Sequence, residues 1–203
     1  MSKIIKDTMS LTAITLVAGL ALGGVHAITE EPIAQQQEKA KIEAYQEVFE
    51  DADSFETIEL TEDLVAQLRE GLDANDCTSQ EIVEIMQAVD ASGNALGYAF
   101  NIVSGGGYGG DIQFSVGIQN DGTVNGISIL SISETAGLGM NANTDGFKSQ
   151  FAGKNVAAFE VTKTGATSDE QIDAISGATI TSKCMVNGVN AGICAFNIME
   201  GGN

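Results

Sequence analysis

The chain has 203 residues, of which 28 are Asp or Glu and only 9 are Lys or Arg, so its formal net charge is −19. This length and a hydrophobic fraction of 43% allow one domain with a packed core plus an additional segment. The charge argues against nucleic acid as a partner, because binding it requires clustered basic side chains that displace counterions.

The scarcity of histidine and the spacing of the cysteines exclude further classes of function. The single histidine, His26, lies at the edge of an apolar segment, which argues against His-based acid–base catalysis and His metal sites. Cys77, Cys184 and Cys194 are far apart and form no Cys-x-x-Cys pair, so we expect buried thiols rather than zinc or iron–sulfur ligands. We therefore expect no metal site on this chain.

The N-terminal segment has the composition of a membrane-spanning helix. Residues 9–27 have no charged side chain if His26 is neutral, and as a helix they would span roughly 28 Å, close to the thickness of a bilayer core. Lys3 and Lys6 precede this stretch, which predicts a cytoplasmic N-terminus and an extracytoplasmic domain. A cleaved signal peptide ending at Ala27 is the alternative. We assign residues 1–28 to this segment.

Residues 29–76 are predicted to form a helical stalk or linker. Pro32 stands where a second helix could begin, and apolar residues follow it at intervals of three and four. This helix could lead away from the membrane or pack on the core as an ordinary amphipathic helix. Residues 51–56 are expected to be an acidic loop, and residues 61–71 a short helix that ends at Gly71.

Residues 77–203 are predicted to form an α+β domain with a mostly antiparallel sheet and flanking helices. Two hairpins are expected, from residues 82–103 and 111–132, the second with strong turn chemistry at Asn120-Asp-Gly122. A further strand is expected within residues 155–162. Residues 180–199 are predicted to close the chain as a helix with one apolar face, formed by Val186, Val189, Ile193 and Phe196.

Two glycine-rich loops connect these strands. Residues 104–110 contain a Gly-x-Gly-x-x-Gly spacing, but a strand and not a helix is predicted to follow, which argues against a Rossmann dinucleotide site. Residues 133–139 form the second loop, where glycine lets the backbone approach a flat ligand closely. Glu134 and Thr135 offer hydrogen bonds to the polar edges of such a ligand.

The segment from Asp173 to Ser182 combines a turn with the start of a helix. Thr179 is predicted to lie where free backbone N–H groups and the positive end of the helix dipole favour a phosphate. Gly177 and Ala178 leave the approach open. A plain turn and helix cap is the alternative, and Thr164-Gly-Ala-Thr167 shows that the four-residue core recurs by itself, with Val161 in place of Asp173.

These three segments together resemble the FMN-binding domain family. The pattern Asp173-x-x-Ser176-Gly177-Ala178-Thr179 resembles its flavinylation motif, in which FMN is joined by a phosphoester to the last threonine. Tyr108-Gly-Gly110 and Glu134–Gly139 resemble its two glycine-rich loops, in the same order. Asp111 and Ala136 depart from the family, which often has proline at these positions.

The resemblance implies covalent FMN on Thr179, within a frame that a flavin transferase recognises during maturation. The remaining residues implied to bind the cofactor are Asp173, Ser176, Gly177, Ala178, Thr181, Lys183, Glu134, Thr135, Gly137, Leu138, Gly139, Tyr108 and Gly109. Lys183, one turn after Thr179, would offset part of the phosphate charge.

The family also implies an electron-transfer role. Such domains occur in RnfG, a component of the ion-translocating ferredoxin:NAD oxidoreductase (Rnf) complex, which also has membrane and iron–sulfur subunits. They occur as well in NqrC, a component of the sodium-translocating NADH:quinone reductase. The length of the chain favours RnfG. A standalone extracytoplasmic flavoprotein without ion pumping and a non-redox binding module are the alternatives.

Overall fold

The computed structural model describes residues 3–201 and divides the chain into two units at Ala40/Lys41. The first unit belongs to α1 (Lys3–Val48), whose residues up to Ala40 are almost all exposed. Among the described residues, α1 holds the one stretch that is long and apolar enough to cross a membrane. The expected second helix start at Pro32 is wrong, because α1 continues through this proline. The missing N–H of Pro32 costs α1 one hydrogen bond but does not end it.

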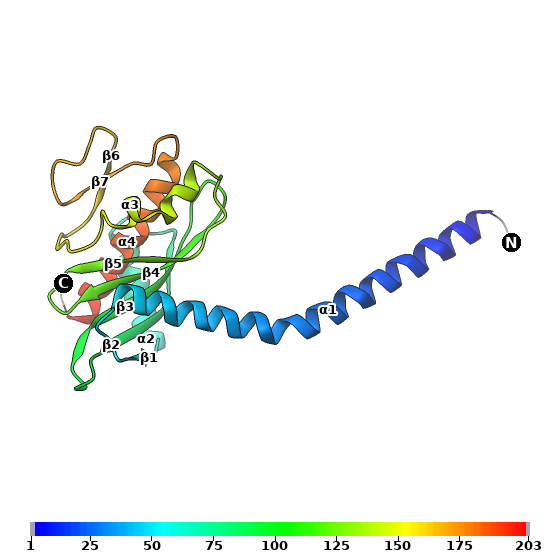
Figure 1. Cartoon of the computed structure of the whole chain (residues 1–203), viewed down its shortest axis with the longest axis horizontal. Helices are drawn as coiled ribbons and strands as arrows, with labels where there is room; N and C mark the ends of the chain where they lie inside the picture. The colour runs from blue at the N-terminus through cyan, green and yellow to red at the C-terminus, as the bar shows by residue number, and fades with distance from the viewer. Residues whose placement is uncertain (1–2, 202–203) are drawn as a thin grey trace. The chain divides into compact units, whose positions relative to one another are not determined.

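The second unit is built on a five-stranded antiparallel sheet in the order β1-β2-β3-β4-β5 (Figure 1). Its strands are β1 (Ser54–Ile58), β2 (Gln80–Val89), β3 (Ala95–Ser104), β4 (Ile112–Gln119) and β5 (Val124–Ser131). Both predicted hairpins and the α+β class are confirmed. The expected acidic loop at residues 51–56 is wrong in part, since Ser54–Glu56 begin the edge strand β1 and direct Glu56 to solvent.

Two helices, α2 (Glu62–Ala74) and α4 (Thr179–Met199), cover the inner face of the sheet. The predicted apolar face of α4 is buried, and a Cβ added at Gly188 would lie 2.5 Å from the ring of Phe114 on β4. The predicted short helix is present as α2, and Thr61 caps it by accepting a hydrogen bond from the N–H of Leu64. The predicted end of α2 at Gly71 is wrong: Gly71 lies inside the helix, where a side chain would collide with Ile198 of α4.

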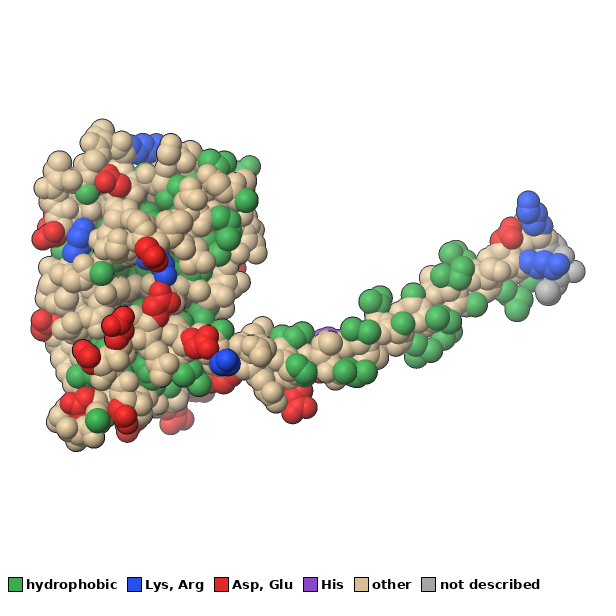
Figure 2. Space-filling view, in the orientation of Figure 1, with side chains coloured by type: hydrophobic (Ala, Val, Ile, Leu, Met, Phe, Trp, Pro, Cys, Tyr) green, Lys and Arg blue, Asp and Glu red, His purple; other side chains and the backbone are tan. Residues whose placement is uncertain are grey.

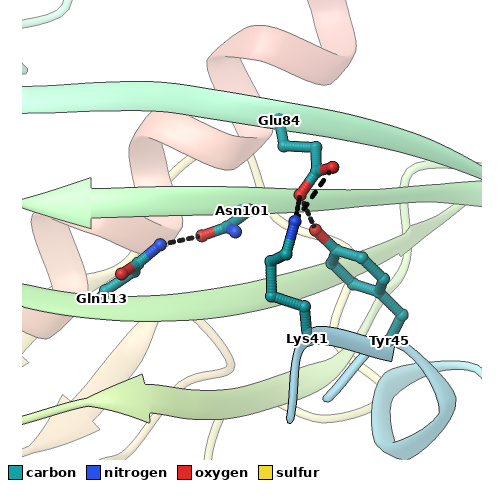
Figure 3. Close-up of polar contacts among 5 residues, drawn as sticks. All are labelled: Lys41, Tyr45, Glu84, Asn101 and Gln113. Atoms are coloured by element: carbon teal, nitrogen blue, oxygen red, sulfur yellow. Dashed lines mark hydrogen bonds and ion pairs between the residues drawn. The ribbon is translucent and has the colours of Figure 1, made fainter. Parts of the chain in front are cut away.

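The outer face of the sheet is covered by the last turns of α1, Lys41–Val48. Tyr45 and Val48 pack there with Ala88 and Ala99, so this part of the predicted stalk packs on the core. Figure 3 shows Lys41 and Tyr45 both reaching the carboxylate of Glu84, at 3.0 and 2.7 Å. Burial alone would raise the pKa of Glu84, but these hydrogen bonds and the Lys41 charge outweigh it and hold that pKa below its usual value.

Between β5 and α4 the chain forms several short elements. They are the 3₁₀ helix η1 (Gly139–Asn143), α3 (Asp145–Lys148) and the parallel strands β6 (Glu160–Thr162) and β7 (Gln171–Asp173). The strand predicted within residues 155–162 is therefore limited to β6. No pattern in the sequence indicated β7, which leads directly into the Asp173–Thr179 turn.

Candidate functional site

Thr179 is the first residue of α4, one position earlier than the predicted helix. The preceding residue, Ala178, provides no side-chain cap, so the N–H groups of the first turn have neither an intrahelical partner nor a capping side chain. Gly177 has a φ of +75°, a conformation that favours glycine and that turns the chain into the helix. The half-buried Thr179 therefore lies beside a helix N-terminus that favours an anion.

The two glycine-rich loops are held together by Glu134. Its Oε1 accepts a hydrogen bond from the N–H of Gly109 in the first loop at 3.2 Å. A Cβ added at Gly107 would lie 2.8 Å from the same oxygen, and one added at Gly109 would collide with the carbonyl of Ser133. Glycine at these two positions is thus what lets the first loop approach the second so closely.

The second loop also meets the start of α4. A Cβ added at Gly139 would lie 2.5 Å from Glu134 Oε2 and 2.7 Å from Thr181 Oγ1. The side chain of Leu138 lies against the turn, with its Cδ2 3.0 Å from the position that a Cβ on Gly177 would take. Three segments that are far apart in the sequence therefore converge around Thr179.

Two buried polar atoms at this convergence have no hydrogen-bond partner. Within the described residues only three buried side-chain oxygens lack one, and two of them are Glu134 Oε2 and Thr181 Oγ1. An unsatisfied buried polar group is costly, and each one in a folded protein calls for an explanation such as a bound molecule. These oxygens, together with the anion-favouring helix start, suit a ligand that has both a phosphate and polar groups, as FMN has.

Apolar side chains are exposed around the same point. Tyr108 is 73% exposed, Leu138 43% and Ile180 53%, and these are three of the six large apolar side chains described as exposed in residues 41–201. Figure 2 shows apolar side chains at the upper right of the domain, where Figure 1 places the two glycine-rich loops. The sequence prediction missed Ile180, although its position off the buried face of α4 could have identified it.

The remaining predicted site residues, apart from Ala178, are exposed. Asp173, Ser176 and Gly177 are exposed on the turn that leads to Thr179, and Ala178 is buried beneath it. Thr135 and Gly137 are exposed on the second loop. Lys183 is exposed one turn beyond Thr179, within α4. This turn is therefore open to an approaching enzyme or ligand.

Cys184 is the one thiol close to these segments. Its Sγ lies 3.4 Å from Ser104 Oγ, inside the core. Burial raises the pKa of this thiol, a hydrogen bond with Ser104 opposes the rise, and the charge of Glu134 adds to it. The buried setting therefore favours the neutral thiol over the thiolate.

Two family descriptions match this chain. The FMN-binding domain matches residues 107–193, which include the second half of the first glycine-rich loop, the whole second loop and the start of α4. The RnfG N-terminal region matches residues 1–48. Among solved structures, the crystal structure of NqrC from Shewanella oneidensis is similar over 58% of this chain and 61% of that one, with a TM-score of 0.49 and 21% identity.

Complex G subunits from three organisms match almost the whole chain. The G subunit of the proton-translocating ferredoxin:NAD(+) oxidoreductase complex of Clostridium ljungdahlii is 30% identical over 96% of this chain and 92% of its own. The Na(+)-translocating counterpart of Acetobacterium woodii is 31% identical over 95% and 91%. The G subunit of the ion-translocating oxidoreductase complex of Methanosarcina acetivorans is 30% identical over 98% and 97%. The chain therefore belongs to the RnfG family, the G subunits of ion-translocating oxidoreductase complexes, and carries the FMN-binding domain.

Proposed function

We propose that this chain is the FMN-carrying electron-transfer subunit of a membrane-bound, ion-translocating ferredoxin:NAD oxidoreductase complex, with the FMN joined by a phosphoester to Thr179. The observation that carries the proposal is the position of Thr179 at the uncapped start of α4, beside two buried oxygens that lack partners.

Each part of the site has a role toward the cofactor. The first-turn N–H groups of α4 would stabilise the phosphate, and Lys183 would offset part of its charge. Glu134 and Thr181 would bind polar groups of the ligand, while Tyr108 and Leu138 would contact its flat ring. The bound FMN would supply the capacity to accept and release electrons, and the protein would supply its position and electrostatics.

A covalent bond also removes a problem that the charge of the protein creates. A chain with a formal net charge of −19 repels a free anionic nucleotide, so reversible binding would be weak. An ester to Thr179 makes the local concentration of FMN independent of that repulsion.

The membrane arrangement is part of the proposal. Residues 1–28 would form the anchor, with a cytoplasmic N-terminus, and the FMN-binding domain, residues 77–203, would lie on the extracytoplasmic side. Residues 41–76 pack in the same unit as this domain. The partners would be the membrane and iron–sulfur subunits of the complex, and a flavin transferase during maturation.

The test is in-gel flavin fluorescence of the denatured full chain, produced together with the flavin transferase of its host. The wild type should fluoresce, and its mass should exceed the mass of the polypeptide by FMN less one water. Thr179→Ala should show neither signal. Equal fluorescence of the two bands would refute attachment at Thr179, and purification without any membrane subunit would favour a standalone flavoprotein.

A further inference from the structure

The backbone of Asp173, at the start of the attachment turn, is held by a side chain from outside the motif. Gln150 Oε1 accepts a hydrogen bond from the N–H of Asp173 at 2.6 Å, and Gln150 Nε2 donates to the carbonyl of Asp173 at 3.4 Å. β7 pairs with β6 along its other edge, where the N–H of Ala174 donates to the carbonyl of Thr162 at 2.8 Å. The amide of Gln150 thus takes the place of a neighbouring strand on the free edge of β7.

The end of the same turn is held from within α4. Ser182, which is fully buried, donates from Oγ to the carbonyl of Ala178 and accepts from the N–H of Ile175, both at 2.9 Å. The N–H of Ala178 also donates to the carbonyl of Ile175 at 2.9 Å. The segment just before Thr179 is therefore tied down at both ends, while Ser176 and Gly177 stay exposed between them.

We infer that Gln150 and Ser182 are positioning residues for the attachment of FMN to Thr179, an inference that rests on the proposed function. The flavin transferase must bring the Thr179 hydroxyl in line with the phosphorus that it attacks. A turn held in one conformation presents that hydroxyl and the Asp173 side chain in a fixed relation, whereas a loose turn would present them in many. Neither side chain needs to touch the cofactor for this effect.

The reaction itself is a phosphoryl transfer without any oxidation. FMN is a phosphate monoester and needs activation, which a flavin pyrophosphate such as flavin adenine dinucleotide provides. A bond forms between Thr179 Oγ and the FMN phosphorus, and the pyrophosphate bond breaks. AMP leaves, and the hydroxyl proton passes to a base of the transferase or to water.

The experiment measures the rate at which purified transferase, supplied with flavin adenine dinucleotide, labels the full-length chain in detergent. Gln150→Met removes both hydrogen bonds at nearly constant size, and Gln150→Glu keeps the acceptor for the Asp173 N–H. Gln113→Met is the matched control. Like Gln150, Gln113 hydrogen-bonds to a single residue, Asn101, but it lies on the outer face of the sheet. Ser182→Ala is matched by Ser128→Ala, a buried serine on that outer face whose Oγ donates to Glu47 of α1.

We expect Gln150→Met and Ser182→Ala to lower kcat for labelling about ten- to a hundredfold, with little change in KM for the chain. Gln150→Glu should recover part of the rate, and both control variants should label at the wild-type rate. Wild-type rates in Gln150→Met and Ser182→Ala would overturn the inference. So would labelling rates that simply follow the melting temperatures across the variants and their controls. A wild-type chain that accepts no label would instead refute the proposed function itself.

Discussion

The chain contains two copies of a hydroxyl residue followed by Gly-Ala-Thr, and only their surroundings differ. Gly165 and Gly177 have φ angles of +93° and +75°, so both copies form a similar turn. After the first copy, the N–H and hydroxyl of Thr167 both bond to Gln171 Oε1 at 3.0 Å, and the chain continues into β7. After the second, Thr179 begins a helix of 21 residues.

This difference shows what the shared residues specify and what they do not. Four residues are enough to form the turn, but they do not by themselves begin a helix after it. The helix dipole, the unpaired first-turn N–H groups and the converging loops exist only around Thr179. The first copy is exposed throughout, and its threonine hydroxyl already has a partner. Substitutions in and around the two copies test whether these surroundings decide which threonine receives FMN.

The largest effect is expected from removing each threonine in turn. Thr179→Ala should abolish labelling, because the acceptor hydroxyl is lost, whereas Thr167→Ala should leave it unchanged. Peptide mass spectrometry after digestion of the coexpressed chain locates the label. A flavin found on Thr167 in the Thr179→Ala variant would mean that the turn alone is sufficient.

Exchanging the residue three positions before each copy tests whether that residue decides which threonine is labelled. Asp173→Val gives the second copy the residue that precedes the first, and we expect labelling about a hundredfold slower because the transferase loses a charged contact. The hydrogen bonds between Gln150 and Asp173 should survive, since they involve only the backbone of Asp173. The reciprocal variant, Val161→Asp combined with Thr179→Ala, should still carry no label. Labelling in this double variant would show that Asp at this position outweighs the helix.

Glu134 distinguishes the surroundings of Thr179 from those of Thr167 most directly. Glu134→Leu leaves the N–H of Gly109 without its acceptor, and we expect the free energy of unfolding to fall by about 1–3 kcal/mol. Glu134→Gln retains an acceptor for that N–H and should cost less than about 1 kcal/mol. In the labelled chain the same Gln variant should raise the midpoint potential of the flavin, because a nearby negative charge is lost. Urea unfolding and a redox titration measure the two effects, and an unchanged potential would place the ring away from Glu134.

The sequence predicted the regular part of the fold because that part depends on local patterns. Asn120-Asp-Gly122 specifies a tight turn, and Gly122 adopts the expected positive φ of +86°. The spacing of Val186, Val189 and Ile193 correctly predicted the buried face of α4. Thr179 was placed at a helix start from the same kind of evidence.

The missed features depend on contacts between distant residues. β7 has only three residues, too few for an alternating pattern to identify it, and it is defined by pairing with β6 on one edge and Gln150 on the other. Nothing near Gln150 in the sequence indicates a contact with Asp173, 23 residues later. Similarly, α1 continues past Pro32 although the proline favours a break. Local propensity cannot report such contacts.

The smallest effect on labelling is expected from a change on the outer face of the sheet. The pKa of Glu84 is lowered in the folded chain, so its contribution to stability is present above its unfolded pKa of about 4.3 and is lost as the pH falls through the folded value. Glu84→Gln should therefore lower stability at pH 7 by about 1 kcal/mol and flatten the loss of stability below pH about 4.3. Urea unfolding at pH 7 and below pH about 4.3 measures both changes in the free energy of unfolding.

Labelling of Glu84→Gln should continue at the wild-type rate, because Glu84 bonds to Lys41 and Tyr45 on the face of the sheet opposite α4. This variant therefore separates the stability of the whole domain from the local arrangement around Thr179. If it slowed labelling as much as Asp173→Val does, the choice between the two threonines would follow from global stability. If the rate is unchanged while stability falls, global stability does not decide which threonine is labelled. The local contacts of the turn, the loops and the helix start then distinguish Thr179 from Thr167.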